Sequence, residues 1–103
     1  MREYRFKRGF KPTQERLEEM IARYFGEFEK NGDVCIVRYR AIEKMRLWLD
    51  GKILKVESKT NPNVDDKTAF ETLKTYNRFL DELTGYTAKE RKKHMMKDVE
   101  SES

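Results

Sequence analysis

Residues 45–56 read MRLWLDGKILKV, and this stretch decides the fold. Asp50-Gly51 is a two-residue type I′ turn signal, because both central positions of that turn need positive φ. It predicts a hairpin in which Leu49 lies opposite Lys52. Side chains alternate between the two faces of a strand. One face therefore receives Met45, Leu47, Leu54 and Val56, and the other receives Arg46, Trp48, Ile53 and Lys55.

A second hairpin is predicted just before the first. Asn31-Gly32 carries the same turn signal and sets Phe28 opposite Cys35. Val37 and Tyr39 continue the Cys35 face, whereas Val34 and Ile36 point the other way. Residues 3–8, EYRFKR, alternate aromatic and basic side chains, which is typical of a half-buried strand. Together these segments predict an antiparallel sheet of four to five strands.

Apolar residues with helical spacing lie both before and after the two predicted hairpins. From Thr13 an apolar stripe runs through Leu17, Met20, Ile21, Tyr24 and Phe25, and Gly26 stands where a left-handed cap ends a helix. A second helix is predicted over residues 65–83, with a stripe formed by Phe70, Leu73, Tyr76, Leu80 and Leu83. Thr87 and Glu90 have the spacing of a capping box that starts a last helix of about three turns.

The order of elements predicts one α+β domain. Helices are expected to pack on one face of the sheet, over residues 1–98, with a frayed polar tail at 99–103. The 103 residues leave little room for a second domain. No run of eighteen apolar residues is present, so no membrane-spanning helix is expected. The basic start lacks an apolar stretch, and the single cysteine suits a reducing cytoplasm, which is the expected location.

The residues needed for catalysis or metal binding are scarce. Cys35 and His94 are the only soft ligands, too few for a zinc site, so no metal and no cofactor are expected. The Cys35 thiol is assigned to the core rather than to nucleophilic chemistry. Neither a Gly-rich phosphate loop nor a serine beside a basic partner is found, and we expect a protein that is not an enzyme. Carboxylates converging from distant segments remain an open alternative.

Basic residues gather at the two ends of the sequence. Residues 1–12 hold five Lys or Arg and one acid, and residues 87–98 hold five basic and two acidic residues, around a balanced middle. Lys89, Lys93 and Lys97 form one line along the last predicted helix, beside Met95 and Met96. Such clusters favour phosphate binding, whereas a surface dense in Lys and Glu is also typical of thermophile proteins.

Trp48 is the second candidate feature. On an open sheet face, flanked by Arg46 and Lys55, it has the arrangement with which several modules stack bases and hold phosphates. The apolar patch that Trp48 forms with Ile53 on this face also fits a subunit interface. The Trp48 face could instead be the core. The candidate nucleic-acid contacts are Arg5, Lys7, Arg8, Arg46, Trp48, Lys55, Lys89, Lys93 and Lys97.

Three stretches resemble a known family. EYRFKRGF (residues 3–10), YNRFLDELTGYTAKERKK (residues 76–93) and the two-hairpin middle look like a small archaeal family of uncharacterised proteins, a domain of unknown function. TGYTAKER is the most distinctive of these motifs. The resemblance covers nearly the whole chain and implies a cytoplasmic archaeal protein, but it carries over no catalytic or binding residue.

Two functions follow as hypotheses. The first is a nucleic-acid-binding accessory protein that makes non-specific phosphate contacts through its basic ends and exposed sheet face. The second is a homodimeric structural or adaptor protein with a protein partner and no nucleic-acid role. A homodimer through part of the sheet is expected with the first, the second predicts a large buried apolar interface, and no membrane contact is expected in either.

Overall fold

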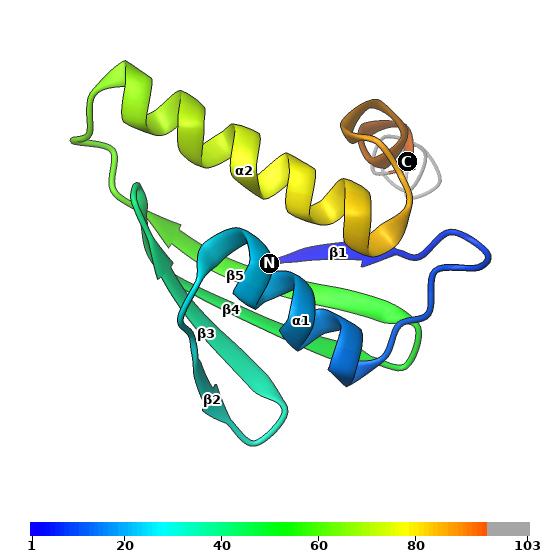
Figure 1. Cartoon of the computed structure of the whole chain (residues 1–103). Coiled ribbons are helices and arrows are strands. Elements are labelled where there is room, and N and C mark those ends of the chain that lie inside the picture. The colour runs from blue at the N-terminus through cyan, green and yellow to red at the C-terminus, as the bar shows by residue number, and fades with distance from the viewer. Residues whose placement is uncertain (95–103) are drawn as a thin grey trace.

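The computed structural model describes residues 1–94 and has the predicted α+β architecture (Figure 1). Five antiparallel strands form one sheet in the order β1-β5-β4-β3-β2. The strands are β1 (Arg2–Arg5), β2 (Glu29–Asn31), β3 (Val34–Tyr39), β4 (Ile42–Asp50) and β5 (Ile53–Thr60). The helices are α1 (Gln14–Phe25), α2 (Asp66–Thr84) and a terminal helix that is described over residues 88–94. The strand predicted over residues 3–8 is thus β1, which begins at Arg2 and already ends at Arg5.

Both predicted hairpins form, but each turn lies one residue later than predicted. Asp50 pairs with Ile53, so the turn is Gly51-Lys52 rather than Asp50-Gly51. Likewise Asn31 pairs with Val34 around Gly32-Asp33. The physical reason is that glycine occupies the first central position of each turn, with φ near +62° and +63°.

This shift changes the partners but keeps the faces. Cys35 pairs with Lys30, and the predicted Phe28–Cys35 pair is wrong because Phe28 precedes β2. Leu47 lies opposite Val56 instead of Leu54. Each partner moves by two positions, and a two-residue shift returns a side chain to the same side of the strand. The predicted inward residues of β3, β4 and β5 are therefore buried: Cys35, Val37, Met45, Leu47, Leu54 and Val56.

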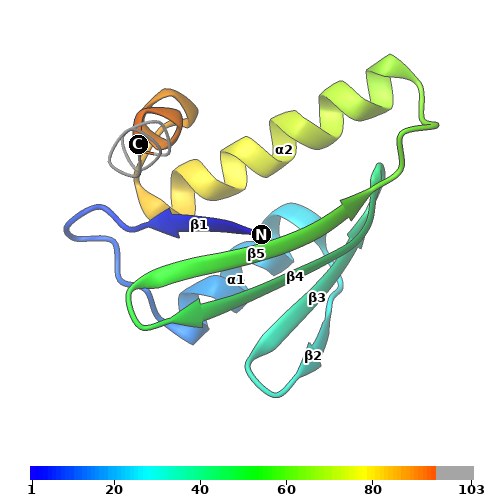
Figure 2. The ribbon, with the colours of Figure 1, turned by 180° about the vertical axis from the view of Figure 1, so that it is seen from behind.

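Helices α1 and α2 lie on one side of the sheet, and the other side is open in the described part of the chain (Figure 1 and Figure 2). α1 begins at its cap Thr13, whose hydroxyl accepts a hydrogen bond from the Arg16 backbone N–H at 3.3 Å. It buries Leu17, Met20, Ile21 and Phe25. Gly26 ends α1 with positive φ, but its ψ of −132° is not the predicted left-handed cap.

The N-terminal half of α2 departs from the prediction. Phe70 and Leu73 are 66% and 56% exposed, so the predicted stripe is not buried against the sheet there. The core contacts of α2 come instead from Thr72, Phe79, Leu80, Leu83 and Thr84. α2 rises away from the sheet toward its N-terminal end (Figure 1). Periodicity marked the apolar residues correctly but could not show that the helix outruns the sheet that it covers.

Gly85, at the end of α2, contacts the first loop, which is the segment of residues 6–13 between β1 and α1. It is the left-handed cap of α2, with φ of 82°, and a Cβ placed there would lie 2.6 Å from the Phe10 ring. Gly85→Ala is therefore expected to lower the free energy of unfolding by about 2 to 3 kcal/mol, from backbone strain and displacement of the ring. Gly32→Ala, with φ of 63° and open space around its Cβ, is the matched control and should cost only about 1 kcal/mol. Denaturant unfolding measures both, and equal losses would contradict the Phe10 contact.

Candidate nucleic-acid interface

The first loop and the last helix lie together at one end of the molecule. The Lys7 backbone N–H donates to the Thr84 carbonyl at 2.7 Å, which fixes the chain just after β1 against the end of α2. The Phe10 ring lies against Gly85, immediately before the terminal helix. The two basic ends of the sequence, about eighty residues apart, therefore meet in space.

Arg16 of α1 holds the rest of the first loop in place. Its guanidinium donates to the Lys11 carbonyl at 2.9 Å and to the Leu83 carbonyl at 3.2 Å. A further bond reaches the Glu82 carbonyl at 3.3 Å. Arg16 thus satisfies free carbonyls at the C-terminal end of α2 while binding the loop to it. Because the Arg16 guanidinium is engaged in these internal hydrogen bonds, the positive charge that faces solvent comes from neighbouring residues.

Six exposed cations gather around this junction. We call them the basic end: Lys7, Arg8, Lys11, Lys89, Lys92 and Lys93. The only acid in residues 6–12 and 84–94 is Glu90. The Glu90 carboxylate accepts hydrogen bonds from the Thr87 backbone N–H at 3.3 Å and from the Thr87 hydroxyl. Both bonds lower the pKa of Glu90. The Glu90 N–H donates back to the Thr87 hydroxyl at 3.3 Å, which confirms the predicted capping box.

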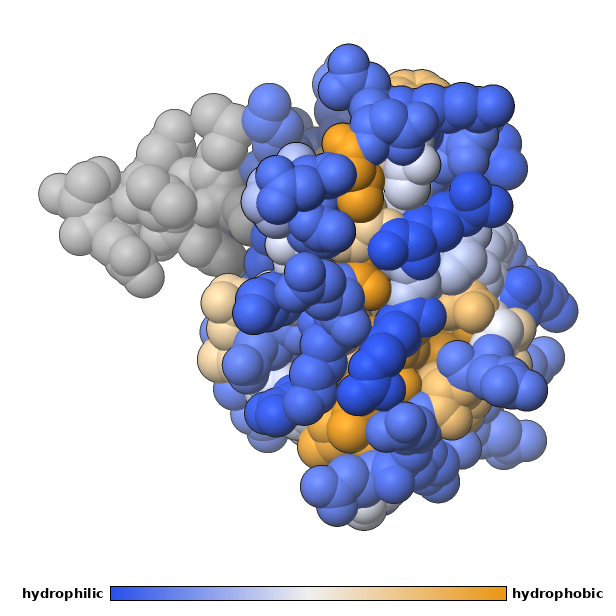
Figure 3. All heavy atoms as spheres, turned by 90° about the vertical axis from the view of Figure 1, so that its left-hand side faces the viewer, coloured by the Kyte–Doolittle hydropathy of each residue, from blue (hydrophilic) through white to orange (hydrophobic). Residues whose placement is uncertain are grey.

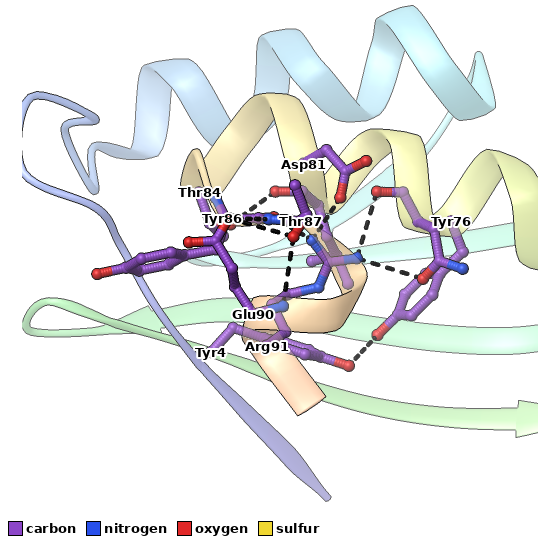
Figure 4. Close-up of polar contacts among 10 residues, drawn as sticks. Tyr4, Tyr76, Asp81, Thr84, Tyr86, Thr87, Glu90 and Arg91 are labelled. Atoms are coloured by element: carbon purple, nitrogen blue, oxygen red, sulfur yellow. Dashed lines mark hydrogen bonds and ion pairs between the residues drawn. The ribbon is translucent and has the colours of Figure 1, made fainter. Parts of the chain in front are cut away.

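Arg91 anchors the terminal helix to α2 (Figure 4). It is 6% exposed, and its guanidinium forms an ion pair with Asp81 at 2.6 Å. It also donates to the Asn77 carbonyl at 3.4 Å, to the Asn77 side-chain oxygen at 3.3 Å, and to the Tyr86 carbonyl. Arg91 therefore differs from its neighbours Lys89, Lys92 and Lys93: it positions the helix, whereas they point charge into solvent.

The predicted Trp48 face is the open side of the sheet. Pairing of Arg5 with Ile53 and of Trp48 with Lys55 puts these four side chains on that side. Trp48 and Arg46 border a shallow hollow of about 350 Å³, together with Asn31, Val34, Ile36, Lys44 and Glu57. Trp48 and Ile53 are half-buried.

Acids balance the cations on this open side. Lys55 forms an ion pair with Asp50 at 3.0 Å, and Arg46 lies opposite Glu57 in the neighbouring strand. Arg38 and Lys59 form further pairs with Glu29 and Glu43. A phosphate approaching the sheet would meet these carboxylates as well as the cations. The two stretches that form the basic end, residues 6–12 and 84–94, hold only Glu90 as an acid, so the two parts of the candidate site differ in charge balance.

The structure therefore divides the predicted contacts into two groups. Lys7, Arg8, Lys89 and Lys93 belong to the basic end, whereas Arg5, Arg46, Trp48 and Lys55 lie on the open side. The groups adjoin where β1 ends, because Lys7 follows Arg5 by two residues. Lys97, Met95 and Met96 lie outside the described residues. Lys11 and Lys92 were not predicted as contacts, although they stand in the same basic stretches of sequence.

Cys35 is fully buried, and burial raises its thiol pKa to about 11, which agrees with the predicted core role. No group of three or more His, Cys, Asp or Glu side chains within residues 1–94 is arranged to hold a metal ion. None of the helices in the same residues is long and apolar enough to span a bilayer.

Comparison with known proteins confirms the predicted resemblance. A family model described as a domain of unknown function, DUF5611, matches residues 1–97. The NMR solution structure of a hypothetical protein from the archaeon Thermoplasma acidophilum is similar, with a TM-score of 0.70 and 31% identity. The match covers 92% of this chain and 97% of the other. No curated protein matches the sequence significantly.

Proposed function

Since this chain belongs to DUF5611, a family of unknown function, we propose from its own surface that it is a non-enzymatic accessory protein that binds nucleic acid. The basic end would contact phosphates, and the binding would be largely independent of base sequence. The open side of the sheet, with Trp48 and Arg46, would receive an unpaired base or the neighbouring backbone.

One observation carries the proposal. Two segments from opposite ends of the sequence, residues 6–12 and 84–94, are joined at the Lys7–Thr84 hydrogen bond; together they expose six cations and contain one acid. Clustered like charges repel one another, so the cluster raises the electrostatic free energy of the free protein. A bound polyanion would lower it. The hydrogen bonds of Arg16 and Arg91 hold the cluster in place before any partner arrives, which lowers the ordering cost of binding.

The first experiment is a titration with short labelled single-stranded and duplex oligonucleotides at low and near-physiological salt. We expect micromolar binding by anisotropy that persists at the higher salt. A change in Trp48 fluorescence on binding would support contact with the open side, and an unchanged signal would confine the contact to the basic end. Binding that vanishes at moderate salt is ordinary charge attraction and would contradict the proposal.

A second candidate function rests on a different surface. Phe70 and Leu73, both more than half exposed, are neighbours three residues apart on α2. In an antiparallel pair of α2 helices related by a two-fold axis, Phe70 would face the partner's Leu73. Asp66 would then lie near the partner's Arg78, so the apolar pair would be flanked by opposite charges. This favours a homodimeric adaptor whose interface is α2 rather than the sheet.

The dimer is tested by light scattering. If α2 forms the interface, Phe70→Lys with Leu73→Lys should weaken dimerisation at least about thirtyfold, because central apolar contacts dominate such interfaces. The matched control, Val34→Lys with Ile36→Lys, alters the open side of the sheet and should leave the dimer intact. If only the control variant dissociates, the interface lies on the sheet instead of α2. If the parent protein is a monomer, the homodimer proposal is wrong.

A further inference from the structure

A groove of about 410 Å³ lies between the N-terminal half of α2 and the sheet, away from the basic end. Its volume falls within the range of small-molecule sites. The apolar part of its lining comprises Ala41, Ile42, Met45, Pro62, Val64, Ala69 and Leu73. Figure 3 shows hydrophobic residues along a band between hydrophilic ones on the side of the molecule that lies at the left in Figure 1.

The groove exists because α2 rises away from the end of β5. The inward positions of β5 are Leu54 and Val56 under the helices, but Ser58 and Thr60 farther along. These two hydroxyl residues point to the helix side and yet are exposed. Across the groove, α2 presents Ala69 and Thr72, which are too small to close the gap. The Thr72 hydroxyl is already used, donating to the Thr68 carbonyl at 2.7 Å.

One end of the groove has more hydrogen-bond donors than acceptors. The hydroxyls of Tyr4 and Tyr76 share a hydrogen bond of 2.9 Å, which uses only one of their two protons (Figure 4). Among the described residues the other proton has no further acceptor. The Arg2 guanidinium lies beside the Tyr4 hydroxyl, and Arg2 and Tyr76 both line the groove. An oxyanion would accept from these groups and offset the guanidinium charge.

The other end of the groove is acidic. Asp66, the first residue of α2, lines the groove ten residues before Tyr76. At 1.5 Å of rise per residue, the two are about 15 Å apart along the helix. A ligand with an anionic group beside Arg2 can therefore extend an apolar body toward Asp66, but a second negative charge there would be repelled.

We propose that this groove binds a small amphipathic monocarboxylate, with its carboxylate at Arg2 and Tyr76 and its apolar body against Met45, Val64 and Leu73. This site goes beyond the proposed nucleic-acid function and involves none of the basic end. A chain or ring system up to about 15 Å long matches the spacing of the two charged ends.

Decanoate below its micelle concentration is the probe, followed by amide chemical shifts and calorimetry. We expect saturable binding with shift changes confined to groove residues. Decanol, which lacks the charge, and decanedioate, which brings a second one near Asp66, should each bind at least about tenfold more weakly. Asp66→Asn should restore the affinity for decanedioate while leaving that for decanoate unchanged.

Two variants localise the site. Arg2→Gln should weaken decanoate binding at least about tenfold, because it removes the guanidinium but keeps a polar side chain of similar length. Arg8→Gln, which removes one exposed cation from the first loop, is the matched control and should bind decanoate normally. Ala69→Phe should fill the groove and abolish binding. Equal affinity for decanol, normal binding by Arg2→Gln, or shifts scattered over the surface would overturn the proposal.

Discussion

The triple variant Lys7→Glu, Lys89→Glu and Lys93→Glu is expected to weaken oligonucleotide binding by at least about a hundredfold near physiological salt. Each substitution removes a cation of the basic end and adds a charge that repels phosphate. The slope of log affinity against log salt should become shallower by about 0.9 for each phosphate of a duplex that the protein no longer neutralises. Anisotropy titrations at several salt concentrations measure both quantities.

The control for this result keeps the same change in net charge. Lys67→Glu, Lys74→Glu and Arg78→Glu alter three exposed cations on α2, away from the basic end. They should reduce binding only slightly, through the overall field of the protein. The three basic-end residues are exposed, so the thermal melt should hardly move. Equal losses from the two triple variants would show attraction to net charge and contradict a site at the basic end.

Arg91→Met is expected to have the largest effect on stability among the charged residues, lowering the free energy of unfolding by about 2 to 4 kcal/mol. Asp81 is 45% exposed, so water screens the ion pair, and most of the loss comes from the bonds to the Asn77 and Tyr86 carbonyls. For a domain of this size the melting temperature should fall by about 10 to 20 °C. Calorimetry measures the loss directly.

The same variant tests whether the terminal helix must be docked for binding. Without Arg91, residues 88–94 lose their main polar link to α2, so Lys89 and Lys93 no longer hold a fixed place beside Lys7. Oligonucleotide affinity should then fall even at temperatures where the protein stays folded. Lys92→Met, an exposed neighbour, should leave the melt within about 0.5 kcal/mol of the parent. A normal melt for Arg91→Met would contradict its anchoring role.

Sequence patterns predicted the elements and faces of this fold better than its contacts. Strand alternation placed Met45 and Leu54 in the core even though both turns were misplaced, because a shift of two residues preserves the face. The exposure of Phe70 could not be predicted in this way. It depends on how far α2 extends past the sheet, which is a property of the assembled layers rather than of a local pattern.

The candidate site was predictable only in part. The two basic stretches are visible in the sequence, but their meeting depends on single contacts such as the Lys7–Thr84 bond. The balance of charge on the open side depends on cross-strand neighbours, such as Arg46 and Glu57, which follow from the true register. The groove was not predicted at all, because Arg2 and Tyr76 come together only through the pairing of β1 with a distant strand.

That pairing has a consequence for synthesis on the ribosome. β1 lies beside β5, with Arg2 opposite Val56, so the first strand made is placed only after the fifth has emerged. At about 5 to 20 residues per second, the wait for the intervening fifty or so residues lasts several seconds. Over this interval Tyr4 and Phe6 have no sheet to cover them. The cations Arg5 and Lys7 alternate with these aromatics, and such charges hinder pairing with other nascent chains. The cations beside these two aromatics would therefore protect the protein before it is folded, whatever it binds afterwards.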